Sequence, residues 1–204
     1  MTEPKKTYSY LALGDSYTIG QSVLSSENFP NQTVQLLNQQ NYNFKSPEIL
    51  ATTGWTTDEL QNNINSHTFT PPYDFVSLLI GVNNQYRGRS VENYKPEFES
   101  LLKQAIQFAG GNANRVIVVS IPDWGVTPFA NGRDRAQIAK EIDDYNAANR
   151  YISEIYKVDY IDITPGSKEA ATDLSLVAGD GLHPSAKEYT RWAQKVFAVI
   201  KQQL

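Results

Sequence analysis

The sequence contains only two histidines, so any mechanism that needs an imidazole base must use one of them. His183 lies in the segment GDGLHPSAKEY, where Pro184 and a capping-box pattern at 185–188 indicate that a helix begins just after it. Asp180 precedes it by three residues, and Gly181 permits a tight turn through which the carboxylate can accept a hydrogen bond from the imidazole. Such a pair supplies a base and its orienting group. The alternative is that both residues only cap the helix or satisfy each other in a surface loop.

The other histidine, His67, lies in INSHTFTPPYDF, a polar segment that leads into an apolar run. Its position predicts a surface residue at the amino end of a strand. Ligands in parallel sheets bind at the opposite edge, so His67 is not expected to take part in chemistry.

Ser16 lies in LALGDSYTIG, where an apolar run ends in a Gly-Asp-Ser turn. A serine here can be the N-cap of a helix. It can also be a nucleophile, because backbone N–H groups at a helix start would stabilise a developing oxyanion. Asp15 is more easily interpreted as a turn residue that bonds its own backbone than as a second acid. Position alone leaves both roles of Ser16 open.

Two other turns follow apolar runs. Gly54, in ATTGWTT, has no side chain, so its backbone N–H can approach a ligand closely. Asn83, in LIGVNNQY, carries an amide that can donate to an oxyanion. Both residue types are also common in ordinary turns.

The elements that must position these residues follow from short apolar runs that alternate with amphipathic stretches. Strands are predicted at 8–13, 44–51, 73–81, 115–121 and 158–163, and helices at 29–40, 56–64, 91–109, 133–156 and from 185 to the end. This order predicts one α/β domain over 1–204, a three-layer α/β/α sandwich with a five-stranded parallel, flavodoxin-like sheet. The irregular stretch 122–132 follows a central strand and should overhang the ligand-binding edge.

Composition narrows the class of protein further. The formal net charge is -4 and no basic stripe occurs, which argues against a nucleic-acid partner. There are no cysteines, and no stretch approaches the 18 apolar residues of a membrane span. The first ten residues lack the apolar region of an export signal, so we expect a cytoplasmic protein, with export of a longer precursor left open. The oligomeric state is not indicated.

Taken in order, four blocks resemble those of the SGNH (GDSL-type) hydrolases over nearly the whole chain: Gly14-Asp15-Ser16, Gly54, Gly81-Val82-Asn83 and Asp180-Gly181-Leu182-His183-Pro184. The resemblance implies a five-stranded parallel sheet between helices. Two positions differ from the family pattern. Asn84 follows Asn83 where the family commonly has aspartate, and Tyr17 follows the serine where the family's name has leucine.

The resemblance also implies residue roles. Ser16 would be the nucleophile, His183 the general base and Asp180 its orienting carboxylate. The oxyanion donors would be the backbone N–H groups of Ser16 and Gly54 and the side-chain amide of Asn83. No metal and no organic cofactor are implied.

The expected reaction is hydrolysis of a small-molecule acyl ester through an acyl-enzyme. Short-chain acyl esters, lysophospholipids and acetylated sugars are the candidate substrates. Trp55, Tyr86, Trp124 and Phe129 fall in strand-end loops, where they line a substrate pocket or simply pack the loops. Two alternatives remain: a flavodoxin-like module that binds a phosphate at 14–16, and a family member that has lost catalysis.

Overall fold

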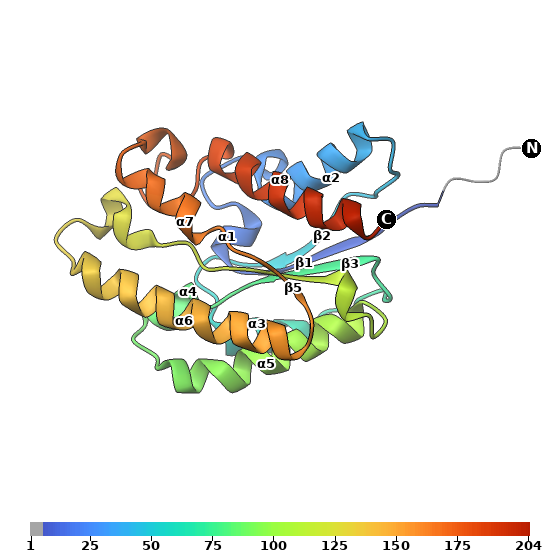
Figure 1. Ribbon diagram of the computed structural model, residues 1–204, viewed down its shortest axis with the longest axis horizontal. Coiled ribbons are helices and arrows are strands. Elements are labelled where there is room, and N and C mark those ends of the chain that lie inside the picture. Colours follow the sequence, from blue (N-terminus) through green and yellow to red (C-terminus); the bar gives the residue numbers. More distant parts are fainter. Residues whose placement is uncertain (1–5) are drawn as a thin grey trace, which may run out of the picture.

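A wholly parallel, five-stranded sheet lies at the centre of the protein in the computed structural model, which describes residues 6–204 (Figure 1). The strand order is β2-β1-β3-β4-β5. The strands are β1 (Tyr10–Gly14), β2 (Glu48–Ala51), β3 (Phe75–Leu79), β4 (Val116–Val119) and β5 (Asp159–Ile161). The predicted sandwich is confirmed. The expectation about the amino terminus rests partly on residues 1–5, which lie outside the described residues.

The register of the sheet brings the ends of three strands together. Gly14, the last residue of β1, lies opposite Ala51 of β2 and Leu79 of β3. Each strand therefore delivers the residues that follow it to the same edge of the sheet. These are the turns that contain Ser16, Gly54 and Asn83.

Helices cover both faces of the sheet (Figure 1). On one face, α2 (Phe29–Gln39) packs against α8 (Ala186–Gln202), and the other face carries α3 (Thr57–Ser66), α5 (Val91–Phe108) and α6 (Arg135–Ile155). Three short helices follow strands directly: α1 (Ser16–Ile19), α4 (Val82–Tyr86) and α7 (Thr164–Ser167). Single 3₁₀ turns occupy Ser25–Glu27, Ala113–Arg115, Trp124–Val126, Pro128–Ala130, Lys168–Ala171 and Leu174–Leu176.

The observed elements differ from the predicted ones mainly at their ends. The second strand begins at Glu48 rather than at residue 44, and Phe44 makes only an isolated bridge with Tyr8. Pro47 has no N–H to give to a strand ladder, which accounts for the interruption. The short helices were not predicted, because four or five residues contain too little periodicity to detect.

Helices α3 and α8 both begin at a capping-box pattern, Thr56–Glu59 and Ser185–Glu188, and the two patterns have different outcomes. At α3, Glu59 accepts a hydrogen bond from the N–H of Thr56 at 2.9 Å. At α8, Ser185 accepts from the N–H of Glu188 at 3.4 Å. The Glu188 carboxylate instead accepts from the indole N–H of Trp192 at 2.8 Å. The α8 cap is therefore one-sided, because the N–H of Ser185 donates to the carbonyl of Leu176 at 2.9 Å and the Glu188 carboxylate satisfies the buried indole.

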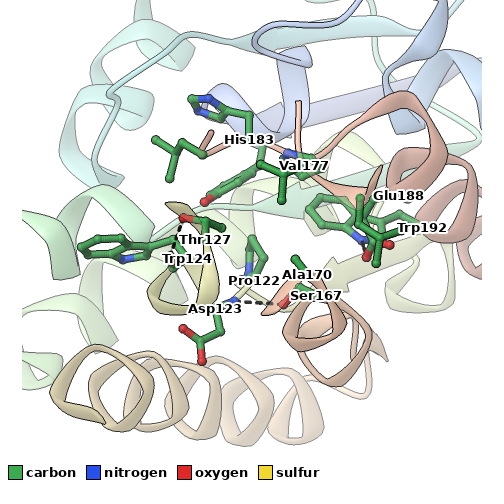
Figure 2. A pocket seen from close by; sticks show the side chains of 14 residues that line it. Pro122, Asp123, Trp124, Thr127, Ser167, Ala170, Val177, His183, Glu188 and Trp192 are labelled. Atoms are coloured by element: carbon green, nitrogen blue, oxygen red, sulfur yellow. Dashed lines mark hydrogen bonds between the residues drawn. The ribbon is translucent and has the colours of Figure 1, made fainter. Parts of the chain in front are cut away.

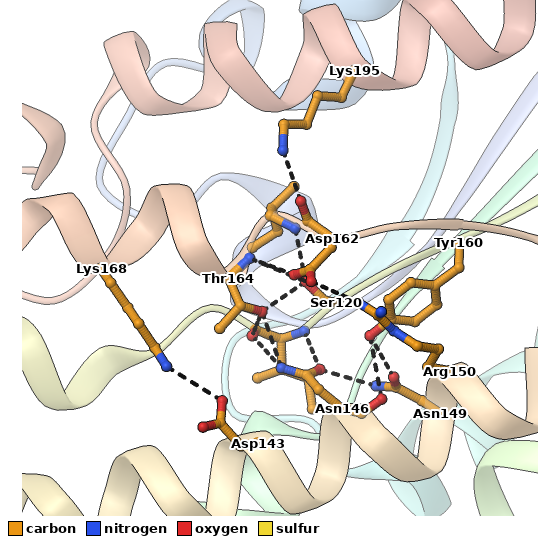
Figure 3. A network of polar contacts seen from close by, with 12 residues as sticks. Ser120, Asp143, Asn146, Asn149, Arg150, Tyr160, Asp162, Thr164, Lys168 and Lys195 are labelled. Atoms are coloured by element: carbon orange, nitrogen blue, oxygen red, sulfur yellow. Dashed lines mark hydrogen bonds and ion pairs between the residues drawn. The ribbon is translucent and has the colours of Figure 1, made fainter.

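A polar network lies where β4 and β5 end (Figure 3). The Ser120 hydroxyl contacts Asp162 at 3.2 Å and Thr164 at 2.8 Å. From α6, the side chain of Asn146 accepts from the N–H of Ile121 at 2.8 Å and donates to its carbonyl at 2.9 Å. This network fixes the start of the 122–132 segment against α6, and that segment supplies two of the aromatic residues discussed below.

Candidate active site

Ser16 is the first residue of α1, directly after β1. The N-cap of this helix is Asp15, whose carboxylate accepts from the N–H of Tyr17 at 3.0 Å. The interpretation of Asp15 as a turn residue is therefore confirmed, and the interpretation of Ser16 as an N-cap is wrong. The Ser16 side chain is not needed for capping, and the residue lines a cavity at the carboxyl edge of the sheet.

His183 and Asp180 are joined in the loop before α8. The Nδ1 atom of His183 lies 2.6 Å from Oδ2 of Asp180. The other carboxylate oxygen accepts from the backbone N–H groups of Leu182 and His183 at 2.9 and 3.0 Å. Burial alone would raise the pKa of Asp180, but hydrogen bonds from the hydroxyl of Ser22, from His183 and from the backbone hold that pKa well below its usual range. Asp180 is therefore a carboxylate at neutral pH, ready to orient the imidazole.

Ser16 and His183 line the same cavity, of about 170 Å³. The chain thus brings together a hydroxyl near its beginning and an imidazole near its end. Within residues 6–204, no hydrogen bond joins the Ser16 hydroxyl to the imidazole. Such bonds in hydrolases often tighten only when substrate binds. The ring of Tyr17 packs against the imidazole, with 5.5 Å between centroids.

Gly54 and Asn83 line the same cavity as Ser16 and His183. Gly54 has a φ of 87°, a left-handed conformation that glycine adopts without strain. The amide nitrogen of Asn83 donates to the Trp55 carbonyl at 2.9 Å and lies 3.5 Å from Oδ2 of Asp15. Because the contact with Asp15 is long, the second N–H of this amide can be given to an oxyanion.

Asp15 is fully buried beneath these residues. Burial raises its pKa to about 7, against the opposing effect of the hydrogen bond from the N–H of Tyr17. Below that pH the side chain is neutral. The electrostatic surroundings of Ser16 and Asn83 therefore change near neutral pH.

Three of the four predicted lining aromatics form one wall of the cavity: Tyr86, Trp124 and Phe129. Their ring centroids lie 5.5 to 6.3 Å apart. The guanidinium of Arg133 lies over all three rings, at 5.1 to 5.4 Å from their centroids. Trp55 does not line the cavity, because its ring packs against the hydrophobic core.

Asn84, which replaces the usual family aspartate, is fully buried below the cavity. Its carbonyl accepts from the N–H of Thr57, and its amide donates to the Thr57 hydroxyl at 2.6 Å. The same amide lies 3.5 Å from the carboxylate of Glu97. An aspartate here would place two carboxylates together, so the amide is the side chain that suits Glu97.

Sequence reasoning missed several residues that also line the cavity: Tyr17, Thr53, Val82 and Leu182. Each is the immediate neighbour of a predicted site residue. Their position next to those turns was the only sequence signal that could have indicated that they line the cavity. Which side chains face inward depends on backbone conformations that the sequence does not specify.

A second, smaller cavity of about 20 Å³ lies beside His183 (Figure 2). Its walls include Trp124, Thr127 and Trp192, together with the buried carboxyl groups of Asp123 and Glu188. Burial raises the pKa of both carboxyl groups. This volume accommodates a water molecule and excludes an ester.

His67 lies at the amino end of the sheet, as predicted. Its side chain is 39% exposed, and its Nε2 atom lies 2.9 Å from the carboxylate of Glu48, the first residue of β2. This position separates it from the cavity lined by His183. In the described residues, no cluster of three or more His, Asp or Glu side chains is arranged to hold a metal ion. Helices long and apolar enough to cross a bilayer are likewise not found in residues 6–204.

The fold and the cavity define a three-layer α/β/α protein with the candidate groups of a serine hydrolase at the carboxyl edge of its sheet. The family model described as GDSL-like Lipase/Acylhydrolase family matches residues 12–191. The chain belongs to the GDSL-like lipase/acylhydrolase family. Membership of this family supports an ester-hydrolysing enzyme.

Solved structures show the same fold at low sequence identity. TesA is 16% identical with a TM-score of 0.75, and the match covers 98% of this chain and 100% of TesA. The acetylxylan esterase Axe2 from Geobacillus stearothermophilus is 18% identical with a TM-score of 0.74, over 95% of this chain and 94% of Axe2. The esterase EstA from Pseudoalteromonas sp., in a structure inhibited by monoethylphosphonate, is 14% identical with a TM-score of 0.74, over 96% and 97%. A comparison with curated proteins gave no match.

Proposed function

We propose that this protein is a serine esterase that hydrolyses short-chain acyl esters, with Ser16 as nucleophile, His183 as general base and Asp180 as the carboxylate that orients it. The observation that carries the proposal is the shared cavity. Ser16 and His183 both line it, and the imidazole is held by Asp180 at 2.6 Å.

The proposed mechanism follows from the protonation of His183. In the neutral imidazole whose Nδ1–H donates to Asp180, Nε2 is unprotonated and can accept the proton of the Ser16 hydroxyl. The serine oxygen then attacks the ester carbonyl. The negative charge that develops is stabilised by the backbone N–H groups of Ser16 and Gly54 and by the amide of Asn83. The tetrahedral intermediate collapses to an acyl-enzyme as the imidazolium of His183 gives its proton to the leaving alcohol. The neutral His183 then takes a proton from the water that attacks the acyl-enzyme, and collapse of the second intermediate releases the acid and restores the Ser16 hydroxyl.

The size of the cavity supports a short acyl group. A volume of about 170 Å³ is close to that of an apolar cavity of about 150 Å³ that holds benzene. Tyr86, Trp124 and Phe129 give it an aromatic wall, which suits an apolar chain of a few carbons. This favours short-chain esters, including the acetyl esters of sugars, over the long chains of lysophospholipids.

The test compares Ser16→Ala with the wild type on p-nitrophenyl acetate. Loss of the nucleophile should lower kcat by several orders of magnitude, about 10⁶-fold where a serine nucleophile is removed from a complete triad. Ser66→Ala is the matched control, because Ser66 is an exposed serine at the end of α3. Circular dichroism checks that both variants are folded. A folded Ser16→Ala variant with a near-normal rate would refute the proposed nucleophile.

A further inference from the structure

The turn after α1 reaches across to the loop that carries the acid–base pair. The hydroxyl of Ser22 donates to Oδ2 of Asp180 at 2.6 Å, although 158 positions separate the two residues. The same oxygen lies 2.6 Å from Nδ1 of His183. Ser22 and His183 therefore share one carboxylate oxygen.

We infer that Ser22 is a positioning residue for the acid–base pair, an inference that rests on the proposed esterase function. The other Asp180 oxygen accepts from the backbone N–H groups of Leu182 and His183. Those two bonds orient the carboxylate within its own loop. The bond from Ser22 joins this loop to the segment that carries Ser16.

The Ser22 turn is itself anchored to the nucleophile. The N–H groups of Gly20 and Gln21 both donate to the backbone carbonyl of Ser16, at 3.1 and 3.0 Å. A short chain of hydrogen bonds thus runs from the Ser16 backbone through the turn to Asp180 and on to the imidazole. Because Ser16 and His183 do not bond each other directly, this connection is a route by which the Ser22 turn can hold the imidazole in place relative to the nucleophile.

The backbone of Ser22 supports a role for its hydroxyl. Its φ is 69°, in the left-handed region where a serine is strained and a glycine is not. The turn alone would be more stable with glycine. The serine is therefore explained by what its side chain does, and its side chain binds Asp180.

Gln21, the neighbouring residue, supplies a control within the same turn. Its side-chain carbonyl accepts from the hydroxyl of Thr53 at 2.6 Å, next to Gly54. Gln21→Ala removes the contact between this turn and the loop that contains Thr53, and it leaves the Ser22–Asp180 bond in place. It separates a general loosening of the turn from a specific effect on Asp180.

The first experiment measures kcat, KM and Tm for Ser22→Ala and Ser22→Gly with p-nitrophenyl acetate. Loss of a hydrogen bond to a charged group at this exposed position should give about a tenfold loss of kcat in both variants. KM should stay within about twofold, because Ser22 does not line the cavity. The Tm of Ser22→Gly should exceed that of Ser22→Ala, because both variants lose the same hydrogen bond and only glycine relieves the left-handed backbone strain. Unchanged kcat in both folded variants would overturn the inference.

The second experiment repeats Ser22→Ala in an Asp180→Ala background. If Ser22 acts through Asp180, its replacement should cost nothing further once that carboxylate is gone. Any effect of Gln21→Ala should be the same in both backgrounds. A tenfold loss from Ser22→Ala that persists without Asp180, or a Gln21→Ala loss that disappears with Asp180, would overturn the inference. Failure of the proposed function would be seen in a different variant, because Ser16→Ala would then be fully active.

Discussion

Replacing the buried Asp15 with asparagine should change how the stability of this protein depends on pH. In the folded protein the pKa of Asp15 is raised by burial from 3.8 to about 7. Between these two values the unfolded chain has lost a proton that the native state still holds. Stability from this residue is therefore present at low pH and is lost as the pH rises toward 7. Asparagine does not titrate, so the variant lacks this loss.

The size of the effect follows from the shift. Each pH unit across this window should lower the free energy of unfolding by about 1.4 kcal/mol in the wild type relative to Asp15→Asn. The shift of about three units gives a total of about 4 kcal/mol between pH 4 and pH 7. Any constant cost of the asparagine, such as an altered contact with Asn83, is the same at every pH and cancels in the comparison.

The assay is urea unfolding of both proteins at half-unit steps from pH 4 to pH 8. The quantity to plot is the difference in free energy of unfolding against pH. Asp143→Asn is the control, because that side chain is 60% exposed and its replacement should give a nearly level line. A level line for Asp15→Asn as well would refute the reasoning, because it would mean that Asp15 ionises equally in both states.

Three further predictions concern the cavity and its support. Asn83→Ala should lower kcat by about 100- to 1,000-fold, as for other oxyanion donors, and a loss confined to KM would contradict that role. Phe129→Ala removes part of the aromatic wall, so the preferred p-nitrophenyl ester should have a longer acyl chain. Each newly buried methylene should add about 0.8 kcal/mol, or about fourfold in kcat/KM. An unchanged preference for chain length from acetate to decanoate would contradict the assignment of this wall. Asn84→Asp should destabilise the protein by about 2 kcal/mol in urea unfolding at pH 8, because it places a carboxylate beside Glu97, and equal stability would show that the amide is not required there.

The parts of the fold that could be predicted from sequence are those with a continuous apolar run or a strong helical period. The apolar run at 73–81 indicates a strand buried on both faces, and the amphipathic stretch of α5 contains enough residues to reveal its helical period. The turns containing Ser16, Gly54 and Asn83 were located because they follow such runs. Parallel strands necessarily bring those turns to one edge.

The remaining features depend on tertiary contacts that local sequence does not specify. The Ser22–Asp180 hydrogen bond joins residues 158 positions apart. The left-handed φ of Ser22 could not be predicted either, because the residue at this position is a serine and not a glycine. The sequence left open whether Trp55 lines the cavity or packs the loops. In the structure its ring packs on the core, while its carbonyl accepts from the amide of Asn83. The sequence was compatible with an aromatic side chain at position 55 that lines the cavity and with one that packs inside the protein. Tertiary packing determines which of the two occurs.

The most direct test of the proposed mechanism is to identify the atom that a p-nitrophenyl alkylphosphonate modifies. Such an ester transfers its phosphonyl group to an activated serine and releases p-nitrophenol. Intact-mass measurement followed by peptide mapping should show one phosphonyl group per chain, on Ser16, with no label in Ser16→Ala and greatly slowed labelling in a His183 variant. Labelling of another residue, with Ser16 unmodified while activity is lost, would contradict the account.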